Sequence, residues 1–203
     1  MPFVRYVYVF ENKGEEMGVT LHHPHGQIYA YPFVPPVIER ELARSREHLR
    51  AHGRCLLCDI LAEEDRDGRR LVATNASFAA YVPFFARWPY EVHVTARRHL
   101  GDLTELSDVE AYDLARVLHG VLRAYDRLFD RPFPYVMAFH QRPGGGGDHA
   151  HYHFHVEFYP PLRSETRLKF LAGSELGAGM FINDTLAEES AARLRAHCPP
   201  DGA

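Results

Sequence analysis

Residues 150–159 read Ala-His-Tyr-His-Phe-His-Val-Glu-Phe-Tyr, a segment in which polar and apolar side chains alternate. Because alternate side chains on a β-strand point to opposite faces, this pattern predicts a strand with its titratable groups on one side. Four titratable groups on one face rarely lie in a core without partners. We therefore expect either a metal site or a hydrated face formed by His151, His153, His155 and Glu157.

The pattern of the remaining chain predicts further strands and three helices. Strands are expected at Val4–Phe10, from about His22 to Tyr31, at Leu71–Val82, at Tyr90–Thr95 and at Pro134–His140. Helices are expected near 37–51, 186–197 and 107–128, and the last begins with the capping-box pair Ser107 and Glu110. Short strands joined by hairpins, with one long helix between them, indicate an α+β fold with an antiparallel sheet.

The composition excludes several classes of protein. The chain has 203 residues, 46% of them apolar, which is enough for one large or two small domains with a core. Its formal net charge of −4 argues against a nucleic-acid-binding protein. It has no apolar run long enough to span a membrane, and its start lacks the layout of a signal peptide, so we expect a cytoplasmic protein. Three cysteines do not indicate a disulfide framework.

The motif of the opening stretch occurs twice. Residues 23–27 read His-Pro-His-Gly-Gln and residues 153–157 read His-Phe-His-Val-Glu, so both have the form His-x-His-x-(Gln/Glu). This echo indicates duplicated units. We therefore divide the chain into the final hairpin of a first unit, residues 1–35, and a complete second unit, residues 36–203. A lone hairpin is marginally stable in water, so the first part needs a sheet to join.

The His-Pro-His triplet, residues 23–25, has the surroundings of a phosphate site. The glycine-containing loop at 11–18 can bring backbone N–H groups close to a phosphate, and Asn12 and Thr20 add neutral donors. A neutral imidazole is a competent nucleophile for phosphorus, and the amide of Gln27 can hold an oxygen that a carboxylate would repel. The alternative is a set of polar residues on a solvated strand edge.

A longer string indicates a family. It consists of Phe10-Glu11-Asn12-Lys13-Gly14, then Met17-Gly18, then His-Pro-His-Gly-Gln-Ile at 23–28. This string resembles the signature of the galactose-1-phosphate uridylyltransferases, which belong to the histidine-triad superfamily. The resemblance continues to Glu175 and covers nearly the whole chain, with the spacing of the family's second half. It implies a histidine-triad-like antiparallel sheet with flanking helices.

The resemblance also implies a reaction, a ping-pong exchange in galactose metabolism (the Leloir pathway). His25 would accept the uridylyl group of UDP-glucose, and galactose-1-phosphate would then take it. Gln27 would stabilise the uridylyl-enzyme, while Asn12 and Thr20 would contact the nucleotide phosphates. The family usually has serine at the position of Thr20, which keeps the hydroxyl.

The hexose side of the resemblance lies in residues 169–175. Here Lys169 would hold a phosphate, Glu175 would accept hydrogen bonds from sugar hydroxyls, and Phe170 completes the expected substrate-binding set, often across a dimer interface in the family. Ser174 replaces a tyrosine common in the family, and Phe181 lies near an expected glutamine. The alternative for Lys169 and Glu175 is an ordinary solvated pair.

Two sets of metal ligands are expected. Cys55-x-x-Cys58 has the spacing of half a zinc site, which His99 and His153 would complete as a closed structural site. The alternative is two ordinary buried cysteines and a surface histidine. The resemblance implies a second cluster, because well-studied members bind iron in this half through one glutamate and three histidines.

The matching positions depart from the family at one place. They are Glu41, His140, His155 and Glu157, and the last is a histidine in the family's His-Ala-His pattern. Glutamate is still a credible ligand for iron or zinc. We expect the two sets to compete for the same residues, and we favour the set with both cysteines because the CxxC spacing is hard to explain otherwise.

Apart from the hairpin at residues 1–35, we find no counterpart in this sequence of the family's first half, which supplies another CxxC and much of the uridine pocket. His23 would then be one ligand of a zinc site shared with that half. We expect one member of a split enzyme, with a separate first-half polypeptide, a homodimer partner or both. Two alternatives remain: an ADP-sugar or dinucleotide phosphorylase or adenylyltransferase of the same superfamily, and a non-catalytic, metal-stabilised half-subunit. Intact His25 and Gln27 argue against the second.

Overall fold

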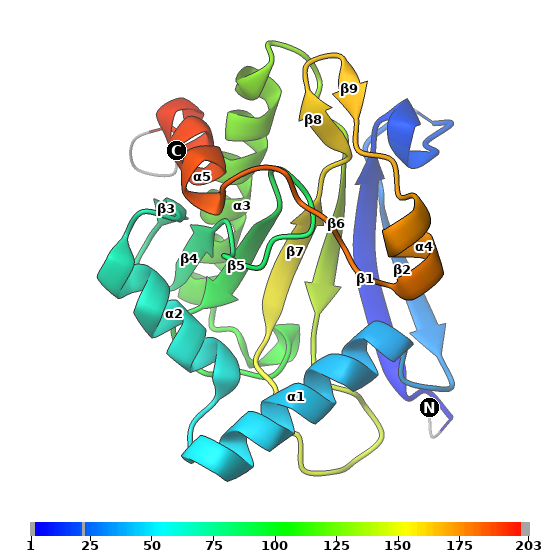
Figure 1. The fold of residues 1–203 in the computed structure, drawn as a ribbon. Helices are drawn as coiled ribbons and strands as arrows, with labels where there is room; N and C mark the ends of the chain where they lie inside the picture. The colour runs from blue at the N-terminus through cyan, green and yellow to red at the C-terminus, as the bar shows by residue number, and fades with distance from the viewer. Residues whose placement is uncertain (1–2, 22, 200–203) are drawn as a thin grey trace.

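The computed structural model of the chain describes residues 3–21 and 23–199 (Figure 1). Within these residues, seven strands form one sheet in the order β2-β1-β6-β7-β5-β4-β3, and every pairing is antiparallel. The strands are β1 Tyr6–Lys13, β2 Gly26–Tyr31, β3 Leu71–Thr74, β4 Phe78–Tyr81, β5 Val92–Ala96, β6 Tyr135–His140 and β7 His155–Tyr159. A separate ribbon pairs β8 Leu162–Ser164 with β9 Arg167–Leu168.

The helices of the described residues are α1 Pro36–His52, α2 Leu56–Asp67, α3 Asp108–Leu128, α4 Gly173–Ala178 and α5 Ala187–His197, with 3-10 turns η1 Glu15–Met17 and η2 Leu103–Glu105. The capping box of α3 is confirmed: Ser107 Oγ accepts from the Glu110 N–H at 3.3 Å, and the Glu110 carboxylate accepts from the Ser107 N–H at 2.9 Å. None of these helices is long and apolar enough to cross a membrane.

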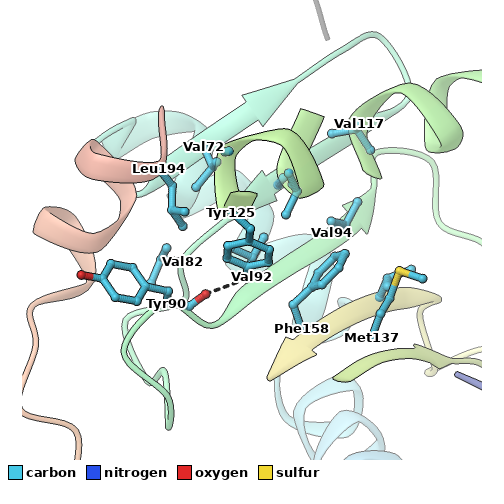
Figure 2. Packing of buried hydrophobic residues seen from close by; sticks show 14 of the residues in the cluster. Val72, Val82, Tyr90, Val92, Val94, Val117, Tyr125, Met137, Phe158 and Leu194 are labelled. Atoms are coloured by element: carbon cyan, nitrogen blue, oxygen red, sulfur yellow. Dashed lines mark hydrogen bonds between the residues drawn. The ribbon is translucent and has the colours of Figure 1, made fainter. Parts of the chain in front are cut away.

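One face of the sheet carries the main core. Helices α3 and α5 pack against each other and against β3, while α3 also contacts β4. Figure 2 shows Val117 and Tyr125 of α3 close to Val92 and Val94 of β5 and to Phe158 of β7, and all five side chains are buried. Burial of this apolar surface is the main favourable contribution to folding.

The opposite face of the sheet is polar near its centre. Alternation along β5 and β7 places His93, Thr95, His155 and Glu157 away from the main core, and all four are buried. Helices α1 and α2 cover this face through two small apolar clusters, made of Tyr6, Ile38, Leu42 and Tyr152 and of Leu61, Ala79 and Tyr81. The titratable side chains are therefore enclosed between the sheet and these two helices.

The expected fold class is confirmed, since the sheet is antiparallel and helices flank both faces. The first hairpin does find a sheet to join, because β1 pairs with β6 as well as with β2, with Phe10 opposite Ala138. The hairpin thus forms one edge of the sheet. The division of the chain at residues 35 and 36 stays a prediction.

The single strand expected at Leu71–Val82 is wrong, because the segment forms the two strands β3 and β4. Asn75 breaks it: its side-chain oxygen accepts hydrogen bonds from the N–H groups of Ser77 at 3.1 Å and of Phe78 at 2.8 Å. This is an Asx turn, in which a side chain replaces the backbone partner that a continuing strand would use.

Two other strands begin later in the structure than the sequence predicts. The strand expected from about His22 begins at Gly26, and His22 itself lies outside the described residues. The strand expected over 150–159 begins only at His155, because the Tyr152 N–H turns back to the His149 carbonyl at 2.8 Å. The sequence analysis also did not anticipate α2, which places the CxxC at the start of a helix.

Candidate functional site

His25 lies in the loop that leads into β2 and is exposed to solvent. Its Nδ1 is 2.7 Å from the carbonyl oxygen of His23. Because a carbonyl oxygen can only accept a hydrogen bond, Nδ1 carries the proton of the neutral ring and Nε2 keeps its lone pair. In its neutral form the ring therefore presents a nucleophilic nitrogen, Nε2, on an exposed residue.

Gln27 lies two residues further on, half-buried in β2. The hydroxyl of Tyr29 donates to Gln27 Oε1 at 3.1 Å, and the amide N–H groups have no hydrogen-bond partner in the described residues, so they can donate to another acceptor. A cavity of about 310 Å³ next to this hairpin is lined by Asn12 and His23, and Thr20 is exposed nearby in sequence. The sequence analysis missed Tyr29, although it shares a strand face with Gln27.

The predicted hexose segment contains an ion pair. Lys169 Nζ is 3.2 Å from Glu175 Oε1, and both side chains are largely covered, so the pair is not an ordinary solvated one. Phe170 is 77% exposed. In the described residues, no hydrogen bond or ion pair joins this segment to His25, so the substrate-binding role of the three residues stays a prediction.

The four residues of the expected Cys/His site converge. Cys55 precedes α2 and Cys58 lies in its first turn, while His99 follows β5 and His153 precedes β7. Cys58 Sγ is 3.6 Å from His99 Nδ1 and 3.4 Å from His153 Nδ1, and Cys55 Sγ is 3.7 Å from His153 Nδ1. All four ligand atoms lie within 4.8 Å of one another, which is the spacing that one tetrahedral ion requires.

One of the two cysteines of this cluster, Cys55, is poised to lose its proton. The hydrogen bond with Cys58, followed by those with His153 and His99, lowers the pKa of Cys55, whereas the bond with Cys55 raises the pKa of Cys58. The two thiols thus share one proton in the metal-free protein. A cation that prefers sulfur and imidazole ligands would displace that proton, so the donor set fits zinc.

A second cluster lies between the polar face of the sheet and α1, and contains Glu41, His140, His155 and Glu157. His140 Nδ1 donates to the Glu41 carboxylate at 3.0 Å, and His155 Nε2 is 3.2 Å from Glu157 Oε1. The four ligand atoms again lie within 4.8 Å of one another. Two carboxylates with two imidazoles form a donor set that suits iron or zinc.

The charges of the Glu/His cluster depend on one another. Burial lowers the pKa of His140, but Glu41 and Glu157 outweigh it and raise that pKa to about 9. Burial likewise favours neutral Glu157, yet the imidazoles of His93, His140 and His155 hold its pKa well below the ordinary value. A bound cation would take over the role that these protons have in the metal-free protein.

The expectation that the two clusters compete for the same residues is wrong. Because β7 begins at His155, His153 lies before the strand and turns to the cysteines, while His155 and Glu157 turn to Glu41. His151 is buried but belongs to neither set. The shared strand face predicted from alternation is thus limited to the last two of the four residues.

The sequence analysis missed a third group beside the Glu/His cluster. Glu91 and His93 lie with Glu157 in a set of ligand atoms within 4.8 Å of one another. A cavity of about 340 Å³ between α1, α2 and the sheet is lined by His93, Glu157, Arg87 and Glu41. The signal was present in the sequence, because Glu91 and His93 alternate with valines in an expected strand as residues 155–158 do.

Comparison with known proteins supports this description. The family described as galactose-1-phosphate uridyl transferase, C-terminal domain, matches residues 41–199, and the corresponding N-terminal domain matches residues 2–35. A galactose-1-phosphate uridylyltransferase of Thermotoga maritima is 45% identical over 194 residues, covering 95% of this chain and 60% of the relative. That of Saccharomyces cerevisiae is 39% identical over 197 residues, covering 96% and 53%.

Solved structures give the same result. A structure of a uridylyltransferase superposes with a TM-score of 0.90 at 45% identity and covers 96% of this chain and 61% of the other. An ADP-glucose phosphorylase from Arabidopsis thaliana with bound ADP-glucose gives a TM-score of 0.82 at 26% identity, covering 95% and 59%. The chain thus spans a little over half the length of the relatives that it matches. With the C-terminal-domain match extending over most of its length, this chain belongs to the galactose-1-phosphate uridyl transferase family.

Proposed function

We propose that this chain supplies the nucleophile of a UDP-glucose–hexose-1-phosphate uridylyltransferase. The observation that carries the proposal is the exposed His25, whose Nδ1 donates to the His23 carbonyl and so leaves Nε2 of the neutral ring with its lone pair. Relatives at 39–45% identity are named for this activity, which favours a uridylyl donor over other nucleotides.

The proposed reaction has two displacements at one phosphorus. Nε2 of His25 attacks the α-phosphorus of UDP-glucose, a P–N bond forms, the bond from that phosphorus to the bridging oxygen breaks, and glucose-1-phosphate leaves. A phosphate oxygen of galactose-1-phosphate then attacks, the P–N bond breaks, and UDP-galactose forms. The amide of Gln27, oriented by Tyr29, donates to a non-bridging oxygen as negative charge builds up there.

We propose that the uridine pocket is completed by first-half residues, whether they belong to the same polypeptide or to another. The supporting observation is the edge strand β2, where Ile28 is 71% and Tyr29 is 47% exposed. Large exposed apolar side chains on an edge strand are typical of a surface that another element covers. His23, exposed and outside the ligand sets of the described residues, would complete a zinc site there.

The hexose end of the site is proposed to lie in a homodimer. The Lys169–Glu175 pair and the exposed Phe170 would contact the hexose phosphate of the partner copy. Zinc is proposed for Cys55, Cys58, His99 and His153 as a structural ion that ties α2 to the sheet. Iron or zinc is proposed for Glu41, His140, His155 and Glu157, where it would supply a buried positive charge and tie α1 to the sheet.

The test measures the intact mass of the protein after incubation with UDP-glucose, with and without a polypeptide that carries the family's first half. The expected result is a gain of one UMP in wild type that disappears in His25→Ala. His119→Ala is the matched control, because this histidine is exposed on α3 far from the hairpin in sequence, and it should keep the adduct. Dependence on first-half sequence would support the shared pocket.

A second candidate function rests on the likeness to the ADP-glucose phosphorylase structure. Incubation with ADP-glucose distinguishes the two, because a gain of one AMP in place of UMP on His25 would replace the uridylyl assignment. If neither donor gives an adduct in the presence of the first-half polypeptide, both activities are contradicted. The metal-stabilised, non-catalytic half-subunit is then the remaining alternative.

A further inference from the structure

One carboxylate joins the Glu/His cluster to side chains outside it. Oε1 of Glu157 lies 3.2 Å from His155 Nε2 and 3.4 Å from His93 Nε2. The second contact follows from the sheet, because His93 of β5 is the direct register partner of Glu157 of β7. The two imidazoles thus contact the same oxygen, with ring centroids 6.1 Å apart and planes at 29°.

A second carboxylate, that of Glu91, holds His93 in place. Its Nε2 is 2.9 Å from Oε1 of Glu91, a carboxylate with no exposed surface. The other oxygen of Glu91 accepts the backbone N–H groups of Arg87 at 2.7 Å and of Trp88 at 3.0 Å. Glu91 is thus fixed by the turn before β5, and its contact with His93 fixes the imidazole against Glu157.

The second oxygen of Glu157 is also held. Arg87 Nη2 lies 3.4 Å from Oε2, and the hydroxyl of Tyr159 donates to the same oxygen. Both oxygens therefore have partners that are outside the four-residue ligand set. These contacts hold the carboxylate in one orientation toward a bound metal ion. Residues that hydrogen-bond to metal ligands raise metal affinity by orienting them in this way.

The charges of this region accommodate one divalent ion. Three carboxylates, those of Glu41, Glu91 and Glu157, carry three negative charges, and Arg87 supplies one positive charge. With the ligands His140 and His155 neutral, as metal ligands must be, and His93 counted as neutral too, one divalent cation makes the total zero. A second would leave two uncompensated positive charges in a buried site, which is costly.

From these contacts and charges we infer that Glu91, His93 and Arg87 are positioning residues for a single divalent ion held by Glu41, His140, His155 and Glu157. Glu91 and His93 orient one oxygen of Glu157, while Arg87 contacts the other oxygen and, with its Nε 3.9 Å from Glu91 Oε1, also neutralises Glu91. Glu91 and His93 thus orient the ligand Glu157, and these three residues together do not hold a second ion. The inference rests on the metal site proposed above and is independent of the His25 chemistry.

Cobalt(II) is the probe, added to the purified full chain after metal removal. Two ions per chain are expected, one giving a thiolate charge-transfer band from the Cys/His site and one giving only d–d bands from the Glu/His site. His93→Leu and Glu91→Gln should lower cobalt affinity at the second site by about 10–100-fold and shift its d–d bands, with the thiolate band unchanged. His93→Gln, which keeps an N–H donor near Nε2, should recover most of the affinity.

Glu64→Gln is the matched control, since Glu64 is equally buried and paired with Arg70 but lies outside both ligand sets. Its cobalt affinity should equal that of wild type. Three ions per chain, or unchanged affinity and d–d bands in both His93→Leu and Glu91→Gln, would overturn the inference alone. If the wild-type protein binds cobalt only at the thiolate site, both the inference and the proposed Glu/His metal site are contradicted. The UMP adduct on His25 tests the proposed nucleotidyl transfer independently of either result.

Discussion

His155 makes the same hydrogen bond within its hairpin that His25 makes within the first one. Nδ1 of His25 donates to the carbonyl of His23 at 2.7 Å, and Nδ1 of His155 donates to the carbonyl of His153 at 2.9 Å. Both rings therefore present Nε2. In the first hairpin that nitrogen faces solvent, whereas in the second it lies buried against Glu157.

The strand register extends this equivalence to the next functional position. Gln27 of β2 lies opposite Phe10 of β1, and Glu157 of β7 lies opposite Ala138 of β6. An amide at this position donates hydrogen bonds and suits a phosphate oxygen, whereas a carboxylate only accepts and suits a cation. The same backbone arrangement thus offers an amide in the first hairpin, where we propose nucleotidyl chemistry, and a carboxylate in the second, where we propose metal ligation.

The orientation of Gln27 gives a first prediction. Tyr29→Phe removes the hydroxyl that holds the Gln27 oxygen, and we expect UMP transfer to His25 to slow by about 5–10-fold, the effect of one neutral hydrogen bond. Gln27→Glu replaces the donor with a negative charge and should cost about 100-fold or more. Tyr31→Phe is the control on the same strand, and pre-steady-state adduct formation is the measurement. Equal rates for Tyr29→Phe and Tyr31→Phe would remove Tyr29 from the mechanism.

Metal removal from the Cys/His cluster gives a second prediction. Cys58→Ser should abolish one bound zinc per chain and lower the thermal midpoint, because α2 loses its tie to His99 and His153. If zinc is present at a thousandfold its Kd, the loss is about 4 kcal/mol, or roughly 8–16 °C. Cys198→Ser, at the third cysteine, should change neither zinc content nor midpoint, as measured by a chromogenic chelator and by calorimetry. Equal zinc content in the two variants would contradict the assigned ligands.

The sequence predicted the metal clusters better than it predicted the strand that carries them. The CxxC spacing and the His-x-His echo pointed to the side chains of the Cys/His cluster, and the family resemblance implied those of the Glu/His cluster, because metal ligands are constrained by chemistry as well as by periodicity. Alternation alone placed His153 and His155 on one strand face, which is wrong. The turn that separates them depends on hydrogen bonds from Tyr152 to His149 and from Phe154 to Leu100, and the second is a long-range contact that no local pattern contains.

His93 shows a different limit of sequence reasoning. Its neighbours Val92 and Val94 predict a buried strand, and a single histidine in such a strand is usually a satisfied core residue. Only the pairing of β5 with β7 brings it to Glu157, and strand order is set by the whole sheet. By contrast, α3 was predictable in both bounds and cap, because the box of Ser107 and Glu110 is a local signal.

The core gives a third prediction, at the hydrogen bond drawn in Figure 2. The hydroxyl of Tyr125 donates to the Tyr90 carbonyl at 2.7 Å, and both residues are buried. Tyr125→Phe leaves that carbonyl without its partner, so we expect a loss of about 1–3 kcal/mol in the free energy of unfolding. Urea denaturation measures it, and Tyr112→Phe, at an exposed position of the same helix, should have no effect. A stability equal to wild type would show that a water or another donor replaces the hydroxyl.

The start of α3 gives a prediction about pH. Hydrogen bonds from Arg98 and from Ser107 lower the pKa of Glu110 to about 2, from an ordinary value of 4.5. A carboxyl whose pKa is lowered by folding stabilises the folded state at pH values above its unfolded pKa, and this stabilisation is lost as the pH falls through the folded pKa. The contribution of Glu110 should therefore be complete above about pH 4.5 and decrease steadily toward pH 2.

The measurement compares wild type with Glu110→Gln by urea denaturation between pH 7 and pH 3. Glutamine can keep the capping box but not the ion pair with Arg98, so the difference in unfolding free energy isolates the charge. It should be largest at neutral pH, at most about 1 kcal/mol because Arg98 is half exposed, and should shrink as the pH falls below 4.5. A difference independent of pH across this window would mean that the carboxylate acts only through its shape, and one that grows on acidification would reverse the assigned direction of the pKa shift.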